Sequence, residues 1–229
     1  MAINPSSPLK NPLCVALDVD TRERAIELMH QLSDVAGGFK LGPRLIHRYG
    51  QSLVSEMAKT APVFVDCKFF DIPTVMEAAV RASFESGASL VTVHAMAGEE
   101  ALTRMATLEK ELNKSRSFRI LAVTILTSWT EKSYPPVMEK KPVADHVRAL
   151  AQMAKNCGLS AVVCSPEEIT LLKDLDLYLL TPGIRLSEDD KGDQKRIMSP
   201  QEAYRRGANA IVVGRPILED PKSASQYMI

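Results

Sequence analysis

Short apolar runs recur eight times along the chain, and a stretch with helical periodicity follows each of them. The runs are apolar on both faces rather than alternating, which is typical of buried parallel strands. Because consecutive parallel strands need a crossover, eight strand-then-helix units predict an α/β fold, the closed (β/α)8 TIM barrel. The candidate strands are residues 13–19, 38–42, 62–68, 89–94, 119–126, 160–165, 177–183 and 210–214.

The alternation continues through the chain without a linker or a change in composition. We therefore predict a single barrel domain over residues 1–229, with residues 1–12 as an extended N-terminal segment. An open doubly wound sheet is the alternative, but eight parallel strands in 229 residues favour closure. Residues that favour helix boundaries stand at the expected places: Thr21, Pro73, Gly87, Ser165-Pro166 and Ser199-Pro200.

The composition carries no bulk charge, because 28 basic and 28 acidic side chains give a formal net charge of zero. We therefore expect neither nucleic acid nor a membrane as a partner. With no apolar signal-peptide core and no run of about 18 apolar residues, a soluble, cytoplasmic protein is expected. The histidines lack HExxH spacing and the cysteines form no CxxC pair, which predicts reduced thiols and no metal site. The cysteines are Cys14, Cys67, Cys157 and Cys164.

The third candidate strand ends V-D-C-K-F-F-D, which places several charges at one point of the barrel rim. Residues two apart share a face of a strand, so Asp66 and Lys68 should project side by side, with Phe64, into the barrel. Lys40, near the end of the second strand, should lie in the same layer, and Asp71 follows just before a helix. Taken alone, this pattern is as compatible with a purely structural role as with a functional site: Asp66 and Lys68 could form a rim ion pair, and Asp71 could cap the following helix.

In chemical terms, Lys40, Asp66, Lys68 and Asp71 form an alternating array of charges beside a cavity. At 4 Å and an effective dielectric near 20, one such pair is worth about 4 kcal/mol. The array can keep a lysine protonated while an aspartate faces a substrate carboxylate. This combination suits a reaction that loses a carboxylate and then needs a proton at the same carbon.

The last two strand ends carry features of a phosphate site. Gly214 allows close backbone approach, and Arg215 adds a charge-assisted contact at a helix start. After the seventh strand, eight of the twelve residues 185–196 are charged, which predicts a phosphate-closing loop over residues 184–196. The alternatives are a turn glycine beside a surface arginine and a solvated turn. Phosphate sites at these two strand ends recur in this fold, which favours function.

Together these segments resemble the orotidine 5′-phosphate decarboxylase family, of the bacterial type, on a ribulose-phosphate-binding-like barrel. The combination of DxKxxDIP with TPGIR and a downstream GDQKR is specific. The matching segments are ALDVD (16–20), FKLG (39–42), DCKFFDIP (66–73), VTVHA (91–95), AVTILTS (122–128), VVCSP (162–166), TPGIR (181–185), GDQKRIMSP (192–200) and VVGRPI (212–217).

The resemblance implies decarboxylation of orotidine 5′-phosphate to UMP and CO2 in de novo pyrimidine nucleotide biosynthesis, with no metal and no cofactor. Lys68 would donate the proton to the ring carbon that loses its carboxylate, and Asp66 would face that carboxylate. Lys40 would hold the network and contact the ribose, whose hydroxyls Asp18 would bind. Asp71 would reach into the neighbouring subunit, which implies a homodimer with shared active sites.

The family also assigns the remaining binding residues. Thr127 and Ser128 would face the pyrimidine, while the phosphate would be gripped by Arg185, Gln194, Gly214 and Arg215. Thr74 is included in the substrate-binding set at the dimer interface. It follows DIP directly, where many relatives have Asn, so it is either the family's threonine shifted by a deletion or a substitute for the Asn. Ala97 replaces a family glycine, and His94 is interpreted as a structural strand-end residue.

Two other functions stay open at this stage. One is a metal-dependent sugar-phosphate decarboxylase, aldolase or synthase on the same type of barrel. Those that hold magnesium use an additional carboxylate at the ligand site, where this chain has Lys40. The other is a non-catalytic pyrimidine-nucleotide-binding barrel, which would bind UMP without turnover.

Overall fold

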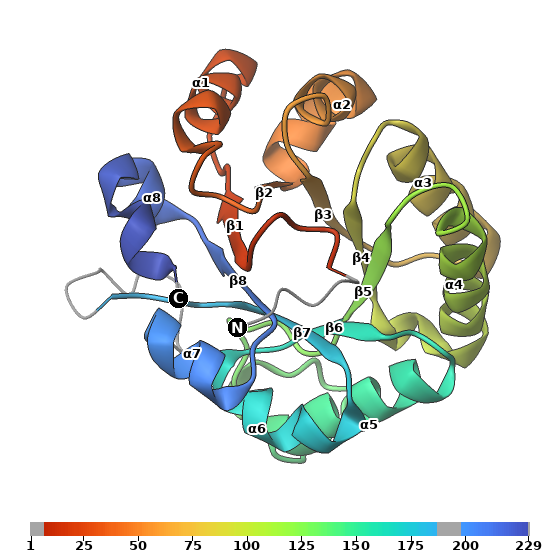
Figure 1. The fold of residues 1–229 in the computed structure, drawn as a ribbon. Helices are drawn as coiled ribbons and strands as arrows, with labels where there is room; N and C mark the ends of the chain where they lie inside the picture. The colour runs from red at the N-terminus through yellow and green to blue at the C-terminus, as the bar shows by residue number, and fades with distance from the viewer. Residues whose placement is uncertain (1–6, 187–197, 229) are drawn as a thin grey trace.

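The computed structural model describes residues 7–186 and 198–228 and forms a closed barrel of parallel strands, in the order β1 to β8. The predicted (β/α)8 fold is confirmed. Figure 1 shows the helices following one another around the outside of the barrel. The strands are β1 (Leu13–Ala16), β2 (Gly38–Leu41), β3 (Val63–Phe69), β4 (Leu90–His94), β5 (Arg119–Val123), β6 (Ala161–Val163), β7 (Tyr178–Pro182) and β8 (Ala210–Val213).

Helices follow the strands in the described part of the chain, and the predicted start signals are confirmed. Thr21 caps the first by accepting from the Arg24 amide, and Ser199 caps the seventh by accepting from the Glu202 amide. Pro73 occupies the first position of the third helix. The helices are α1 (Arg22–Leu32), α2 (Pro43–Met57), α3 (Pro73–Glu85), α4 (Gly98–Leu112), α5 (Val143–Asn156), α6 (Ile169–Leu172), α7 (Pro200–Arg206) and α8 (Arg215–Glu219).

The structure differs from the sequence prediction at several element boundaries. β5 ends at Val123 rather than at residue 126, and its pairing with both neighbours ends there, with His94 of β4 and Val163 of β6. The Thr124 hydroxyl instead donates to the Val163 carbonyl at 3.0 Å. The segment after Ser165-Pro166 is helical only in short pieces, with α6 between two 3-10 turns (Pro166–Glu168 and Lys173–Leu175).

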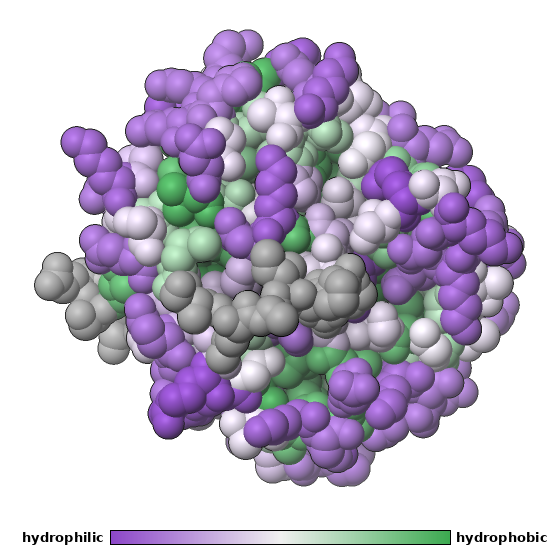
Figure 2. Space-filling view, viewed as in Figure 1, coloured by the Kyte–Doolittle hydropathy of each residue, from purple (hydrophilic) through white to green (hydrophobic). Residues whose placement is uncertain are grey.

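Two apolar layers stabilise the barrel. The inner layer contains Phe64 of β3, which is buried as the strand periodicity predicted. The outer layer lies between strands and helices and contains Phe39, Val63 and Val65. Hydrophilic side chains cover most of the helical periphery, with smaller apolar patches between them (Figure 2).

Residues 7–12 lie at the N-terminal end of the barrel. Leu9 is buried within the inner apolar layer, and its amide contacts the Ser7 hydroxyl. The Arg119 guanidinium, at the start of β5, lies 4.6 Å from the ring centroid of Tyr178, at the start of β7. This end of the barrel is therefore filled by side chains, which leaves the opposite end available for a ligand.

No described helix is long and apolar enough to cross a membrane. All four cysteines are free thiols, with Cys14 and Cys164 buried. Burial raises the pKa of the Cys14 thiol to about 12, although the nearby Lys40 charge opposes the shift. Cys14 is therefore an uncharged part of the barrel interior at neutral pH.

Replacing Phe39 with Ala should lower the free energy of unfolding by about 3–5 kcal/mol, because Phe39 is fully buried between the barrel and its helices. Urea denaturation followed by circular dichroism would measure the change. The matched control is Val137→Ala, at a side chain 93% exposed, for which a change within about 0.5 kcal/mol is expected. Equal effects of the two substitutions would contradict the assigned packing.

Candidate active site

A cavity of about 300 Å³ opens among the carboxyl ends of the strands. Its floor is apolar and includes Ala16, Phe64, Val163, Leu180 and Val212, while its rim is charged. In barrels of this type, ligands bind at this end. The cavity is lined by nine of the predicted site residues: Asp18, Lys40, Asp66, Lys68, Thr127, Ser128, Arg185, Gly214 and Arg215.

Asp66 stands at the centre of the charged rim. One of its oxygens, Oδ1, accepts a hydrogen bond from the Lys68 ammonium at 2.9 Å, and Oδ2 lies 3.5 Å from the Lys40 ammonium. Lys40 also lies 3.5 Å from Asp18, so its charge bridges two carboxylates. The side chains of Asp66 and Lys40 are only 14% and 12% exposed, whereas that of Lys68 is 38% exposed. Of the two lysines that line the cavity, Lys68 is therefore the more exposed.

The backbone at Lys68 departs from the simple strand alternation that predicted its position. Lys68 has φ of 49°, in the left-handed region, and the β3–β4 register shifts between Val65 and Phe69. Such a conformation costs an L-residue roughly 1–2 kcal/mol. The Lys68 amide donates to the Thr92 hydroxyl at 2.9 Å, and that hydroxyl donates to Asp66 Oδ1 at 2.9 Å. Asp66 and Lys68 are neighbours as predicted, but an irregular strand end, not regular pleating, brings them together.

The three charges of this network reinforce one another. Burial favours the neutral form of the Asp66 carboxyl, but the charges of Lys40 and Lys68 outweigh it and hold the pKa of Asp66 below its usual range. Burial likewise favours neutral Lys40, yet the two carboxylates beside it raise the pKa of Lys40 above its usual value. Both groups are therefore charged at neutral pH.

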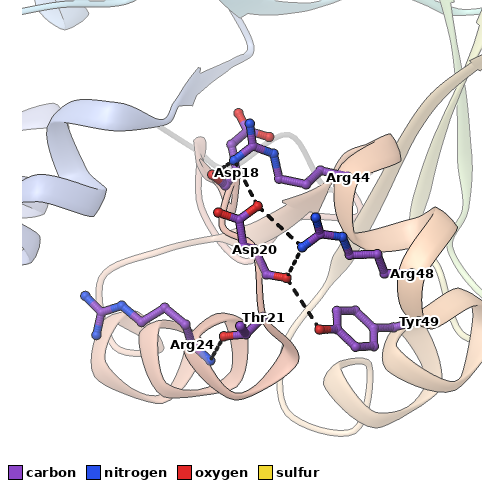
Figure 3. Close-up of polar contacts among 7 residues, drawn as sticks. All are labelled: Asp18, Asp20, Thr21, Arg24, Arg44, Arg48 and Tyr49. Carbon is purple, nitrogen blue, oxygen red and sulfur yellow. Dashed lines mark hydrogen bonds and ion pairs between the residues drawn. The ribbon is translucent and has the colours of Figure 1, made fainter.

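The loop after β1, which carries Asp18, is held from outside by α2 (Figure 3). Arg48 donates to the Asp20 carbonyl at 2.6 Å, and the Tyr49 hydroxyl donates to the same oxygen at 3.4 Å. Arg44 lies 3.5 Å from the Asp18 carbonyl and 3.4 Å from the Asp20 carboxylate. These contacts fix the loop backbone while the Asp18 side chain remains half exposed toward the cavity.

The side of the cavity predicted to bind phosphate is built by β7 and β8. Gly183 adopts φ of 83°, a conformation that favours glycine, and lets the chain turn directly after β7. Arg185 is 6% exposed and donates to the Ile184 carbonyl at 2.8 Å. The Arg185 amide donates to the Met198 carbonyl, and the Met198 amide to the Gly183 carbonyl. These bonds join the two ends of the predicted phosphate-closing loop.

Most of that loop, including Gln194, lies outside the described residues. Gly214 lies between β8 and α8, and Arg215 is the first residue of α8 and is exposed at the cavity rim. Two arginines, one buried and one exposed, thus line the same side of the cavity.

Thr127 and Ser128 lie on the loop after β5, where the Trp129 amide donates to the Leu126 carbonyl in a turn. Ile125 and Leu126 also line the cavity and were not among the predicted site residues. They add an apolar wall beside the two hydroxyls. The segment V-T-I-L was assigned to the fifth strand, so Ile125 and Leu126 were expected to be buried in the strand rather than to line the cavity.

Asp71 and Thr74 do not line the cavity of their own chain, and both are exposed. Asp71 accepts from the Ile72 amide at 2.7 Å, but the N-cap residue of α3 is Ile72 rather than Asp71. Three apolar side chains around them are also exposed: Phe70 at 61%, Ile72 at 62% and Val75 at 46%.

His94 ends β4 beside this exposed segment. Its ring stacks on Phe70 with centroids 5.5 Å apart, and its Nδ1 accepts from the Met96 amide at 3.3 Å. Burial, aided by the Lys68 charge, lowers the pKa of His94. A neutral ring that packs and caps a turn agrees with the structural role that the sequence suggested.

Over residues 7–186 and 198–228, no group of three or more His, Cys, Asp or Glu side chains is placed to hold a metal ion. At the cavity rim, the Lys40 ammonium lies between the carboxylates of Asp18 and Asp66. A cation at that point would face an ammonium group, so the donor set there favours an anionic or polar ligand.

Fold and site together define a (β/α)8 barrel in which a lysine–aspartate network from β2 and β3 and arginines from the segments after β7 and β8 line one cavity. The family model described as orotidine 5′-phosphate decarboxylase / HUMPS matches residues 11–227. The chain belongs to this family.

Relatives of known name agree over nearly the whole chain. The orotidine 5′-phosphate decarboxylase of Carboxydothermus hydrogenoformans is 38% identical over 213 residues, covering 90% of this chain and 88% of the relative. That of Vibrio vulnificus is 37% identical over 218 residues, covering 93% and 94%. The crystal structure of orotidine 5′-phosphate decarboxylase from Lactobacillus acidophilus aligns with a TM-score of 0.78 at 30% identity, covering 94% and 96%.

Replacing Lys40 with Met should destabilise the protein at neutral pH by about 3 kcal/mol, because it leaves the buried Asp66 carboxylate with one partner fewer. The pKa of Asp66 is lower in the folded protein than in the unfolded chain, so its ionised form stabilises the fold at pH values above its unfolded-state pKa. This stabilisation is lost as the pH falls through the pKa of Asp66 in the folded protein. Without Lys40 that pKa rises, so Asp66 becomes neutral at a higher pH. The destabilisation should therefore shrink as the pH falls from about 7 to about 3.

Urea denaturation of wild type and variant across this pH range would measure the effect. The matched control is Lys59→Met, at an exposed lysine near the end of α2, which should change stability by less than about 0.5 kcal/mol at every pH. A Lys40→Met effect that does not change with pH would contradict the electrostatic assignment.

Proposed function

We propose that this protein is a carboxy-lyase that converts orotidine 5′-phosphate to UMP and CO2. The observation that carries the proposal is the Asp66–Lys68 pair, joined at 2.9 Å at the mouth of a cavity, in a chain of this family. The expected pathway is de novo pyrimidine nucleotide biosynthesis, and the cytoplasmic location predicted from the sequence stays a prediction.

Lys68 and Asp66 would act at the reacting carbon. The bond between the ring carbon and its carboxylate breaks, CO2 departs, and the electron pair stays on the ring carbon. Lys68 Nζ then gives a proton to that carbon, which completes the C–H bond of UMP, and the neutral amine regains a proton from solvent. Asp66, held ionised by its two lysine neighbours, would face the substrate carboxylate and keep the Lys68 ammonium in place.

The surrounding network would hold the Asp66 and Lys68 charges in position before the substrate binds. Enzymes typically lower barriers by about 8–23 kcal/mol, and a carbanion without an electron sink makes this reaction demanding. An ammonium already placed where negative charge develops lowers the barrier without reorganisation in the transition state. Lys40 contributes by bridging Asp66 and Asp18, the latter proposed to bind the ribose hydroxyls.

Binding far from the reacting carbon would supply the remaining energy. Arg185, Gly214 and Arg215 line one side of the cavity and are proposed, with Gln194, to bind the phosphate. Thr127 and Ser128 are proposed to face the pyrimidine next to the apolar wall of Ile125 and Leu126. Binding energy from the phosphate can then be used to order the groups around the ring.

A homodimer with shared active sites completes the proposal. Asp71 does not line its own cavity, yet it belongs to the same short motif as Asp66 and Lys68. The exposed Phe70, Ile72 and Val75 beside it form an apolar patch of the kind that marks protein interfaces. Covering this patch with a second copy would bring the partner's Asp71 toward the site, with Thr74 at the same interface.

The main alternative is a metal-dependent sugar-phosphate decarboxylase, aldolase or synthase on the same type of barrel. The ammonium of Lys40 between Asp18 and Asp66 disfavours it. Activity on orotidine 5′-phosphate that EDTA abolishes and magnesium restores would favour this alternative. A protein that binds UMP but shows no turnover would instead be a nucleotide-binding barrel.

Lys68→Ala should lower kcat for orotidine 5′-phosphate by at least about 10³-fold, because the proton donor is removed. Loss of the orotate-ring absorbance measures turnover, and circular dichroism checks that the fold is retained. The matched control is Lys59→Ala, at an exposed lysine outside the cavity, which should leave kcat unchanged. An active Lys68→Ala enzyme would overturn the assigned role.

Shared sites predict complementation between two inactive variants. In an equal mixture of Lys68→Ala and Asp71→Ala subunits, half of the dimers are mixed and each holds one intact site, so about a quarter of wild-type activity should return. Mixing Lys68→Ala with Asp66→Ala is the control, because both residues serve the same subunit's site and no intact site can form. No recovery in the first mixture, after verified subunit exchange, would count against sharing.

A further inference from the structure

Thr92, in the middle of β4, is a buried polar residue that makes two hydrogen bonds at the candidate active site. It is 0% exposed and does not line the cavity. Its hydroxyl oxygen lies 2.9 Å from the Lys68 amide nitrogen and 2.9 Å from Asp66 Oδ1. A single side chain on the neighbouring strand therefore touches both members of the lysine–aspartate pair, one through its backbone and one through its carboxylate.

The direction of both hydrogen bonds follows from chemistry. The Lys68 amide can only donate, so the Thr92 oxygen accepts from it. An ionised Asp66 carboxylate can only accept, so the single Thr92 proton points to Oδ1. The result is a directed chain from amide to hydroxyl to carboxylate, in which each bond polarises and strengthens the next.

These two bonds act where the strand is least regular. Lys68 is one of two non-glycine residues with positive φ in the described part of the chain, and the β3–β4 register shifts at this point. A residue held in a sparsely populated conformation persists only when its surroundings determine it. The hydrogen bond from the Lys68 amide to Thr92 holds this backbone conformation. It therefore also fixes the direction in which the Lys68 side chain leaves the backbone.

We propose that Thr92 is a positioning residue, whose hydroxyl sets the orientation of the Asp66 carboxylate and the backbone of the proton donor Lys68 together. It acts through these two residues and does not touch the ligand. The inference rests on the proposed decarboxylase function, because it concerns how that reaction's proton donor is aligned.

The test compares variants with and without the hydroxyl. Thr92→Val keeps the shape of the side chain and should lower kcat for orotidine 5′-phosphate by about 10- to 100-fold, since small misplacements of reacting groups cost up to about 10²-fold. The KM should stay within about threefold of wild type, because the proposed phosphate and ribose contacts lie elsewhere in the cavity. Thr92→Ser keeps the hydroxyl and should restore kcat to within about threefold of wild type.

Thr124→Val is the matched control. Thr124 is also 0% exposed, and its hydroxyl donates one hydrogen bond to the Val163 carbonyl, away from the lysine–aspartate pair. Its kcat should stay near that of wild type. If Thr92→Val does not fold, Thr92→Ala against Thr92→Ser isolates the hydroxyl, and the same 10- to 100-fold gap in kcat is expected between them.

Equal kcat values for Thr92→Val and Thr124→Val, in an active wild-type background, would overturn the positioning role while leaving the proposed function intact. A wild-type protein with no turnover of orotidine 5′-phosphate would overturn the function instead. In that case a crystal structure of Thr92→Val decides the structural part of the inference. Lys68 should leave the left-handed region, and an unchanged φ near 49° would overturn it.

Discussion

The structure of the site depends on the ion network of Lys40, Asp66 and Lys68. Two of these side chains are largely buried, and a lone charge there would carry a desolvation penalty that folding could not tolerate. Each charge is acceptable because the next lies at hydrogen-bond or ion-pair distance. The network therefore stabilises charged side chains at the end of the barrel interior, where uncharged side chains would pack more easily.

The two ends of the barrel differ: the N-terminal end is filled by packed side chains, and the opposite end holds the cavity. At the N-terminal end, Leu9 is buried in the inner layer and Arg119 stacks on Tyr178. At the other end, the floor of the cavity is the top of that same apolar layer, so the charged rim rests on a rigid base. The loop that carries Asp18 gains a further support from α2 (Figure 3). The lysine–aspartate network thus stands on packed elements, while Arg185 and Arg215 belong to the segments that follow β7 and β8.

The strands, the helix starts and most of the cavity residues could be predicted because they depend on patterns of neighbouring residues in the sequence. Buried parallel strands read as apolar runs, and Thr21, Pro73 and Ser199 mark helix starts through their own backbone chemistry. Strand ends identified the cavity residues, since all parallel strands end at the same side of a barrel. Thr92 was missed even though it is a polar residue two positions from the inward-facing Leu90, a parity that signals an interior position.

By itself, the sequence determined the barrel, the strand that carries each charged residue and the family to which the chain belongs, because these follow from periodicity, strand ends and motif spacing. Only the tertiary structure decided where β5 stops and how Lys68 meets Asp66. β5 stops where its pairing with β4 and β6 ends, and the Lys68 amide is bound by a hydroxyl 24 residues away. Contacts between strands that are distant in the chain have no local signal, so folding in three dimensions alone sets them.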